Sequence, residues 1–167
     1  MAEFRKMRRF RQQLPDEMAL AILKAGSSCV LALAGDDGYP YAVPVSYVCQ
    51  DGKIYFHGAK SGHKVDAISR CDKASLCVVA KDDIVENEFT TYFRSVIVFG
   101  RIRALDNDDD KRTYAAALAR KYSPHESEMA VQKAIDKEWD ALAVYEMTIE
   151  HMTGKEAKEL VREREAR

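Results

Sequence analysis

The sequence predicts a mainly β fold, a β-barrel of about six antiparallel strands with flanking helices. Three observations support this prediction. Short apolar stretches, continuous or alternating, recur along the 167 residues; clusters of turn residues separate many of them; and helical periodicity is confined to a few short segments. Closing such strands into a barrel removes exposed sheet edges, which would otherwise present unpaired backbone groups.

The first helix and the first strand are predicted near the N-terminus. Residues 15–17 (Pro-Asp-Glu) suit a first helical turn, an apolar face follows at helical spacing, and Gly26 suits the end of this short capping helix. Residues 28–34 have the composition of a buried strand. Residues 35–38 (Gly-Asp-Asp-Gly) then provide the turn that begins a hairpin.

The next segment is predicted as two further strands joined by a tight turn. Residues 41–48 alternate, although Pro44 cannot donate a ladder hydrogen bond and therefore belongs at a sheet edge, a bulge or a ligand. Residues 50–53 (Gln-Asp-Gly-Lys) are a strong hairpin signal. Residues 53–57 are rich in aromatic and β-branched side chains, which favours a strand.

The centre of the chain is predicted as strands separated by a loop. A strand covers residues 74–80, a polar loop covers 81–88, and a long β run covers 90–105. Gly100 lies inside that run, where an isolated glycine is typical of a bend or bulge.

Two helices, one strand and a tail complete the prediction. Acidic residues at 106–110 precede a helix that ends at Tyr122, and a second helix covers about 126–139. Residues 141–149 alternate as the last strand. The tail after Gly154 is charged, and we expect a frayed helix there.

Length and composition indicate a single domain over residues 1–167, with an N-terminal arm at 1–14 and a charged C-terminal tail at 155–167. The formal net charge of -1 gives no strong attraction to nucleic acid or to a membrane. No apolar run approaches the roughly 20 residues of a membrane span, and no secretory signal follows the basic start. We therefore expect a cytoplasmic protein without nucleic-acid or membrane partners.

The cysteines and acidic residues do not form a metal-binding pattern. Cys29, Cys49, Cys71 and Cys77 lack C-x-x-C spacing, and we expect them to be reduced, half-buried thiols. No histidine or cysteine cluster has ligand spacing, and the acidic stretch at 106–110 lacks the glycine and glutamate of a calcium loop. No metal site is predicted.

Residues 58–64 (Gly-Ala-Lys-Ser-Gly-His-Lys) are a candidate anion site. They lead into a helix with Ser61 as its expected N-cap, and helix N-termini bind anions through free N–H groups and the helix dipole. The lysines would neutralise a phosphate, and the glycines would let the backbone approach it. The same residues also suit a solvated loop whose lysines serve only solubility.

His57 closes the strand before this loop, where its imidazole could contact a ligand, move a proton near neutral pH or simply cap the hairpin. The motifs G-x-S-x-G and G-x-G-x-x-G, a P-loop and a persuasive Cys-His pair are all absent from the sequence. If the protein is an enzyme, a cofactor therefore carries the chemistry.

Four segments in order carry a family resemblance: residues 38–45 (GYPYAVPV), 54–64 (IYFHGAKSGHK), 90–100 (TTYFRSVIVFG) and 149–155 (IEHMTGK). The chain resembles the FMN-binding split-barrel family of pyridoxamine 5'-phosphate oxidase-like proteins, and within it the 5-nitroimidazole reductase (Nim) branch. The likeness covers most of the chain. It implies a six-stranded antiparallel split barrel, a two-fold homodimer, and FMN in a groove between the subunits.

The resemblance also implies which residues surround the cofactor. Three residues would present their backbone to the isoalloxazine ring, three would line the ribityl and phosphate path, four would meet the phosphate, and four would approach from the partner subunit. In that order they are Val43, Pro44 and Val45; His57, Gly58 and Ala59; Lys60, Ser61, His63 and Lys64; and Ser95, Val96, Ile97 and Val98. His57 matches a histidine near the flavin in the Nim branch and is the candidate catalytic residue.

The implied function is reduction of small aromatic or nitro compounds by an FMN-binding oxidoreductase that takes electrons from NAD(P)H. One alternative is a non-catalytic flavin-binding or electron-transfer dimer. A second is a pyridoxamine 5'-phosphate oxidase-like enzyme, although residues 161–167 do not match the Arg-containing C-terminal segment of the true oxidases. Further alternatives are another cofactor, such as a deazaflavin or haem, and a structural dimer without a ligand.

Overall fold

The computed structural model describes residues 3–166, so Met1 and Ala2 of the predicted arm and Arg167 of the predicted tail lie outside the described residues. Seven strands within this range form one antiparallel sheet. They are β1 (Ser28–Ala34), β2 (Pro40–Ser46), β3 (Val48–Gln50), β4 (Lys53–Ala59), β5 (Lys73–Val85), β6 (Thr90–Ala104) and β7 (Leu142–Glu156). The helices are α1 (Asp16–Ala25), α2 (His63–Arg70), α3 (Asp108–Tyr122), α4 (Glu128–Glu138) and α5 (Lys158–Glu165).

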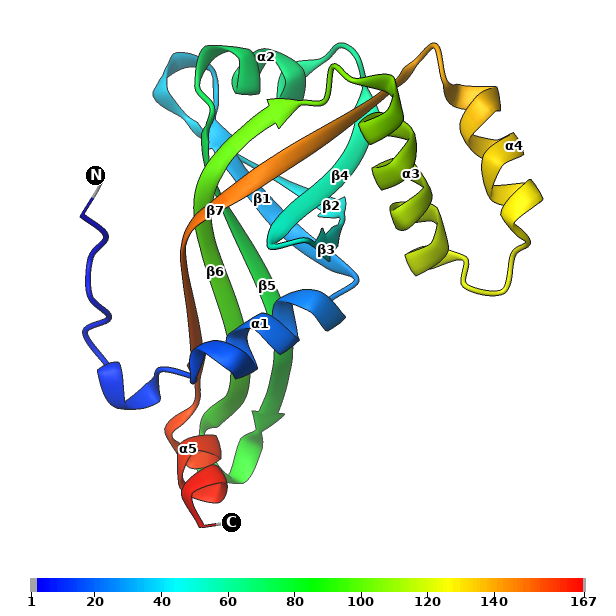
Figure 1. Cartoon of the computed structure of the whole chain (residues 1–167). Coiled ribbons are helices and arrows are strands. Elements are labelled where there is room, and N and C mark those ends of the chain that lie inside the picture. Colours follow the sequence, from blue (N-terminus) through cyan, green and yellow to red (C-terminus); the bar gives the residue numbers. More distant parts are fainter. Residues whose placement is uncertain (1–2, 167) are drawn as a thin grey trace.

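The sheet has the strand order β2-β1-β5-β6-β7-β4-β3 and curves around the core (Figure 1). The edge strands β2 and β3 are consecutive in the chain, and no ladder joins them within residues 3–166, so the barrel is split. This confirms the mainly β prediction and the edge position expected of Pro44. No helix of the described chain is both long enough and apolar enough to cross a membrane.

The predicted count of six strands is wrong because the predicted strand at 41–48 breaks at Tyr47. Its side chain is fully buried and donates a hydrogen bond to the Leu23 carbonyl oxygen at 2.6 Å. Its backbone N–H donates to the Tyr122 hydroxyl at 2.8 Å instead of to a neighbouring strand. These contacts to distant elements divide the segment into β2 and β3.

The predicted polar loop at 81–88 is also wrong. β5 continues to Val85, whose ladder partner is Thr90 in β6, and a short turn at Glu86–Glu88 connects them. Most side chains of this extension are exposed, including Ile84, as expected for a two-stranded ribbon that projects beyond the core. Polar residues suit such a ribbon, so polarity alone could not distinguish it from a loop.

Gly100 marks a β-bulge, as predicted. The pairing of β6 with β7 shifts register between Phe99 and Gly100. A Cβ atom on Gly100 would lie 2.1 Å from the Thr148 carbonyl oxygen, so a larger residue cannot occupy this position without moving backbone.

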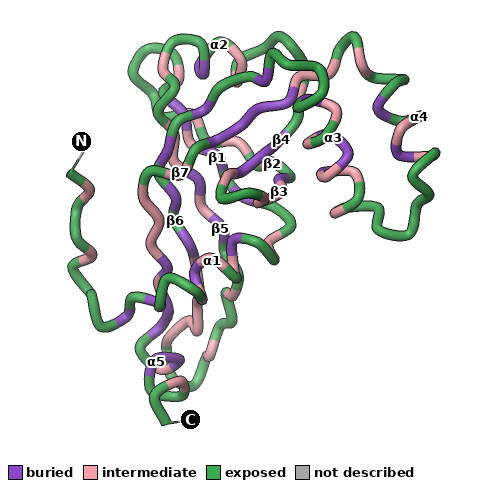
Figure 2. Tube along the Cα trace, viewed as in Figure 1, coloured by how far each residue is buried: buried purple, intermediate pink, exposed green. Residues whose placement is uncertain are grey.

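The core occupies the inside of the curved sheet (Figure 2). α1 contributes Ala19 and Leu23 to it, and α2 contributes Ala67 and Ile68. α1 ends at Gly26, as predicted. Figure 1 shows α2 at one end of the barrel and α1 crossing the sheet near the other, which confirms the expectation that the first helix is a capping element.

A second apolar cluster lies on the other face of β4 and β7. Tyr55 and Val144 pack there against Ala115 of α3 and against Val131 and Ile135 of α4. Neighbouring residues of β7 therefore face different cores. This cluster attaches the α3–α4 helical hairpin to the barrel.

The two chain ends dock on the sheet. The Leu14 N–H donates to the Gly154 carbonyl oxygen at 3.0 Å, and the Phe4 ring stacks on His151 with centroids 4.6 Å apart. α5 buries Leu160 and Val161, so the expectation of a frayed tail is wrong within the described residues. α5 contacts the single helical turn at Phe10–Gln12.

Candidate functional site

The junction between β4 and α2 carries most of the residues that the sequence predicts for the site. β4 ends with His57, Gly58 and Ala59, and α2 begins four residues later at His63. The N-cap of α2 is Gly62, so the prediction that Ser61 is the N-cap is wrong. The backbone of Gly62 has a φ of 121°, a conformation that favours glycine. No side chain caps the helix, so its first N–H groups are free to meet an anion.

Lys64 places its ammonium group against the end of β4. Its Nζ lies 3.0 Å from the position that a Cβ on Gly58 would occupy, and 5.6 Å from the centre of the Phe56 ring. Burial lowers the pKa of Lys64. No carboxylate of residues 3–166 lies within ion-pair distance of this ammonium. The junction therefore holds a half-buried cation without a counter-charge, above a strand residue that has no side chain.

His57 lies one residue before Gly58, and its side chain is on the opposite face of β4 from this ammonium. Its side chain is exposed at the strand end, yet surrounding protein atoms and then the charge of Lys64 lower its pKa below the ordinary value of 6.5. The imidazole is therefore neutral at pH 7, with one nitrogen that donates and one that accepts a hydrogen bond. Its catalytic role stays a prediction.

His63 points to a different group of residues. Its ring stacks on Tyr41 with centroids 3.9 Å apart, and its Nε2 lies 3.4 Å from Oδ2 of Asp36. The hairpin turn before β2 thus holds this side chain, while its backbone N–H remains at the start of α2. The predicted phosphate contact is more readily made by that N–H than by the imidazole.

Lys60 lines a separate cavity of about 340 Å³ between α2, β6 and β7. Arg103 and Tyr145 line the same cavity, and the Tyr145 hydroxyl donates to the Ala59 carbonyl oxygen at 3.2 Å. The side chains of Lys60, His63 and Lys64 therefore lie in three different places and not around one common site. Lys64 is the one whose ammonium lies on the predicted cofactor strand.

A larger cavity of about 800 Å³ lies on the other side of β4, against the α3–α4 hairpin. Three predicted cofactor residues, His57, Gly58 and Ala59, line it together with Ser46 at the end of β2. The facing wall is mainly small and apolar. It includes Ala115, Leu118 and Ala119 of α3 and Ala134, Ile135 and Glu138 of α4.

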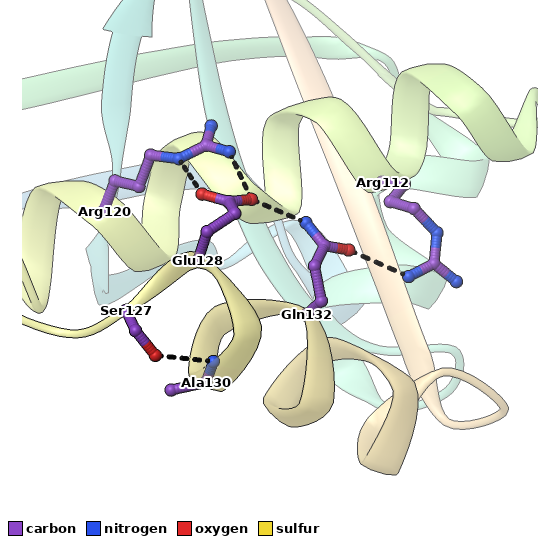
Figure 3. Close-up of polar contacts among 6 residues, drawn as sticks. All are labelled: Arg112, Arg120, Ser127, Glu128, Ala130 and Gln132. Carbon is purple, nitrogen blue, oxygen red and sulfur yellow. Dashed lines mark hydrogen bonds and ion pairs between the residues drawn. The ribbon is translucent and has the colours of Figure 1, made fainter.

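Polar contacts hold the two helices of this wall together (Figure 3). Arg120 donates to both carboxylate oxygens of Glu128, at 3.1 and 2.7 Å. Gln132 donates to Glu128 at 3.0 Å and accepts from Arg112 at 3.2 Å. Ser127 caps the start of α4. This ladder joins α3 to α4, and both helices line the cavity opposite β4.

The end of α3 is anchored to the barrel. The Lys121 ammonium donates to the carbonyl oxygens of Gly26 and Tyr47, at 2.5 and 2.8 Å. The next residue, Tyr122, donates from its hydroxyl to Tyr47 O at 2.8 Å and also lines the large cavity. The wall is therefore attached to the same turn that separates β2 from β3.

The residues predicted on β2 and β6 divide between the two faces of the sheet. Val43 and Val45 pack against the core, and Val96 and Val98 are fully buried within it, so these valines offer only backbone to a ligand. Pro44, Ser95 and Ile97 lie on the outer face. Pro44 and Ile97 belong to one row across the sheet, which passes through Val30 and Cys77. All these contacts stay predictions.

The sequence reasoning missed the whole helical wall of the large cavity. The alanine-rich run at 115–119 could have indicated a wall of small side chains. Alanine also has the highest intrinsic helix propensity, so the run equally indicates an ordinary helix. Glu138 gave no signal, because charged residues surround it in the sequence. Among the described residues, no group of three or more His, Cys, Asp or Glu side chains could hold a metal ion, and all four cysteines are free.

Comparison with known proteins places this geometry in a wider group. Three similar solved structures are a protein assigned to 5-nitroimidazole antibiotic resistance from Bacteroides thetaiotaomicron, a conserved hypothetical protein from Mycobacterium tuberculosis, and an FAD and haem binding protein from Mycobacterium smegmatis. In that order the identities are 19%, 15% and 22%, and the TM-scores are 0.69, 0.77 and 0.71. Coverage of this chain is 86%, 93% and 88%, and coverage of the other chains is 85%, 92% and 74%. At these identities the likeness shows the fold.

The sequence itself gives the more specific result. No curated protein sequence matches the chain. The family model described as pyridoxamine 5'-phosphate oxidase matches residues 15–156, which include every strand, the β4–α2 junction and the helical wall. This match confirms the resemblance that the four sequence segments suggested, and the chain belongs to the pyridoxamine 5'-phosphate oxidase family.

Proposed function

We propose that this protein is an FMN-binding oxidoreductase that reduces small aromatic or nitro compounds with electrons from NAD(P)H. The carrying observation is the uncompensated ammonium of Lys64, which lies against Gly58 at the uncapped start of α2. A half-buried cation without a partner is unfavourable unless an anion completes it. A flavin phosphate is an anion that fits this arrangement.

The residues at the junction suit one terminal phosphate. The Lys64 ammonium and the N–H groups of His63 and Lys64 offer a cation and backbone donors, and Gly58 leaves room above the strand. The Mycobacterium smegmatis relative is described as binding FAD and haem, which supports flavin binding by this fold and makes FAD and haem the alternatives to test. One cation with one helix start matches the monophosphate of FMN.

A bound flavin supplies two-electron transfer, by taking a hydride from a reduced nicotinamide and passing electrons to an acceptor. The chain supplies placement and protons. Reduction of a nitro group to a nitroso group consumes two electrons and two protons and releases one water. Neutral His57 lines the cavity and can donate a hydrogen bond to the acceptor and pass on a proton.

The absorption spectrum of the purified protein tests flavin binding. Flavin bands should travel with the wild type through gel filtration after addition of FMN. Lys64→Ala should weaken FMN binding at least about tenfold, because it removes a charge-assisted contact, and Lys60→Ala should weaken it less. Lys133→Ala, on the exposed surface of α4, is the charge-matched control. A wild-type protein that stays colourless with excess FMN contradicts the proposal, and a haem spectrum or a preference for FAD corrects the cofactor.

Stopped-flow mixing separates a reductase from a flavin carrier. NADH or NADPH should bleach the bound flavin, and a nitroaromatic compound should restore its colour. Flavin that binds but is not reduced by either donor would indicate the non-catalytic alternative.

A further inference from the structure

The large cavity against the α3–α4 hairpin lies across β4 from the Lys64 ammonium, and His57, Gly58 and Ala59 line it. We propose that this cavity is the acceptor pocket, and that it selects flat aromatic molecules that are neutral or cationic over anionic ones. The inference rests on the proposed function. It assigns the specificity of the reaction to the helical wall, and in particular to Ala134 and Glu138.

The size and lining of the cavity suit an aromatic ring. Its volume of about 800 Å³ lies within the range of small-molecule sites, and it exceeds what one or two fused rings need. The wall opposite β4 presents methyl groups of Ala115, Ala119 and Ala134 with the larger Leu118 and Ile135. Because these side chains are short, they leave a broad space. An aromatic ring that enters it buries apolar surface of both the ring and the wall, which favours binding.

Two polar side chains give the pocket its orientation and charge preference. His57 lies on the β4 side and is neutral at pH 7. Glu138, the last residue of α4, lines the cavity from the opposite helix with an exposed side chain and has no cation within ion-pair distance among residues 3–166. The lining as a whole therefore carries one uncompensated negative charge, which repels a carboxylate on the acceptor.

The arrangement also keeps the acceptor at the cofactor strand. His57, Gly58 and Ala59 form one wall of the pocket and belong to the predicted cofactor contacts. A ring bound between this strand and α4 lies next to the residue that can donate a hydrogen bond to it. The Arg120–Glu128 ladder and the Lys121 anchor hold the opposite wall in place.

A pair of matched probes tests the charge preference. 4-Nitrobenzamide and 4-nitrobenzoate share the ring and the nitro group and differ by one negative charge. Binding is measured by calorimetry on the flavin-loaded protein, and KM is measured for the same compounds. The wild type should bind the amide about tenfold more tightly than the benzoate, and Glu138→Gln should reduce this ratio to about two- or threefold. Glu126→Gln, outside the cavity, should leave the ratio unchanged.

A second variant tests the location. Ala134→Leu should fill the pocket and weaken binding of both probes about tenfold, while Ala130→Leu, one turn earlier on α4 and outside the lining, should not. Flavin content should be the same in all variants. Loss of flavin from Ala134→Leu would overturn the inference, because the cofactor itself would then fill the cavity.

The remaining outcomes are equally decisive. An unchanged amide-to-benzoate ratio in Glu138→Gln overturns the charge preference, and unchanged binding in Ala134→Leu overturns the location. Failure of the proposed function is seen separately, as a wild type without flavin bands. Calorimetry without flavin then shows whether the cavity still binds the amide, and absence of that binding in the wild type overturns the inference as well.

Discussion

The residues of the barrel interior differ sharply in chemical availability, and Cys29 is the clearest case. It is 4% exposed, and burial, followed by the nearby Cys77, raises its pKa to about 12 from the ordinary 9.0. At pH 8 this lowers the thiolate fraction about a thousandfold, and the thiolate is the reactive form. Iodoacetamide labelling of the native protein, followed by peptide mass analysis, should therefore modify Cys29 much more slowly than the half-exposed Cys71. Equal rates would contradict the burial of Cys29.

His57 predicts a pH dependence of stability. Burial and the charge of Lys64 lower its pKa in the folded protein below the 6.5 of the unfolded chain, so the unfolded state binds more protons as the pH falls. Stability attributable to this group is fully present above about pH 6.5 and is lost as the pH falls through the lower folded pKa. Urea unfolding between pH 8 and 5 should show a shallower decline for His57→Gln than for the wild type. His125→Gln controls for the loss of a histidine elsewhere, and parallel curves for His57→Gln and the wild type would refute the prediction.

A buried hydrogen bond from the Tyr47 hydroxyl joins the connection between β2 and β3 to the end of α1. Tyr47→Phe removes the donor to the Leu23 carbonyl oxygen and leaves that buried oxygen unpaired at the end of α1. We expect a loss of about 1–2 kcal/mol in the free energy of unfolding, measured by urea denaturation. Tyr92→Phe, which removes an exposed hydroxyl bound to Glu88, should have little effect. Equal effects of the two variants would mean that the Tyr47 hydrogen bond does not stabilise the α1–β2 connection.

The β6–β7 bulge leads to a prediction that depends only on a steric clash at Gly100. Gly100→Ala forces a methyl group against the Thr148 carbonyl, which is backbone and cannot move cheaply. The expected loss is about 2 kcal/mol or more in the free energy of unfolding. Gly52→Ala meets no neighbouring atom but has a φ of 74°, so its cost is the smaller strain of about 1 kcal/mol. Thermal unfolding of both variants tests the order, and a smaller effect at Gly100 would contradict the bulge geometry.

Elements defined by local signals could be predicted from the sequence, and elements defined by distant partners could not. The bounds of β1 agree with the prediction at both ends, and the hairpin at 50–53 has the positive φ angles at Asp51 and Gly52 that its residues favour. The break at Tyr47 depends on its contact with Tyr122, the last residue of α3, which follows 75 residues later. The extension of β5 at residues 81–85 has no buried face, so its sequence lacks the alternation of apolar and polar residues that would predict a strand.

The same distinction applies to the candidate site. The β4–α2 junction is contiguous in sequence, so its glycines and lysines could be recognised together. The facing helices could not, because Ala134 and Glu138 are brought to the cavity by the tertiary packing of α4, chiefly against α3. The directions of side chains could not be predicted from the sequence either. His63 is an example, because its imidazole contacts Asp36 and Tyr41.

The whole molecule has an apolar outer sheet face that its own helices leave open. Val30, Val79, Ile97 and Phe99 lie on this face and are 43%, 62%, 40% and 40% exposed. Isolated exposed side chains are ordinary, but four on adjacent strands form a patch of the kind that interfaces use. Ser95 belongs to the same face and, with Ile97, to the set expected to reach the flavin of a partner. A second copy of the chain is therefore the occupant that the proposed function requires.

Dimerisation and flavin binding should therefore fail together. Val79→Asp combined with Ile97→Asp places charges in the centre of the face, where burial against a second copy would be costly. Sedimentation velocity should show the wild type as a dimer with bound FMN and the double variant as a folded monomer with greatly weakened FMN binding. Met129→Asp, at an apolar position on α4 that is 82% exposed, should remain a flavin-loaded dimer. A double variant that still dimerises and holds flavin would show that the subunits meet elsewhere, whereas a monomer that keeps its flavin would show that Lys64 and α2 hold the cofactor without help from a partner.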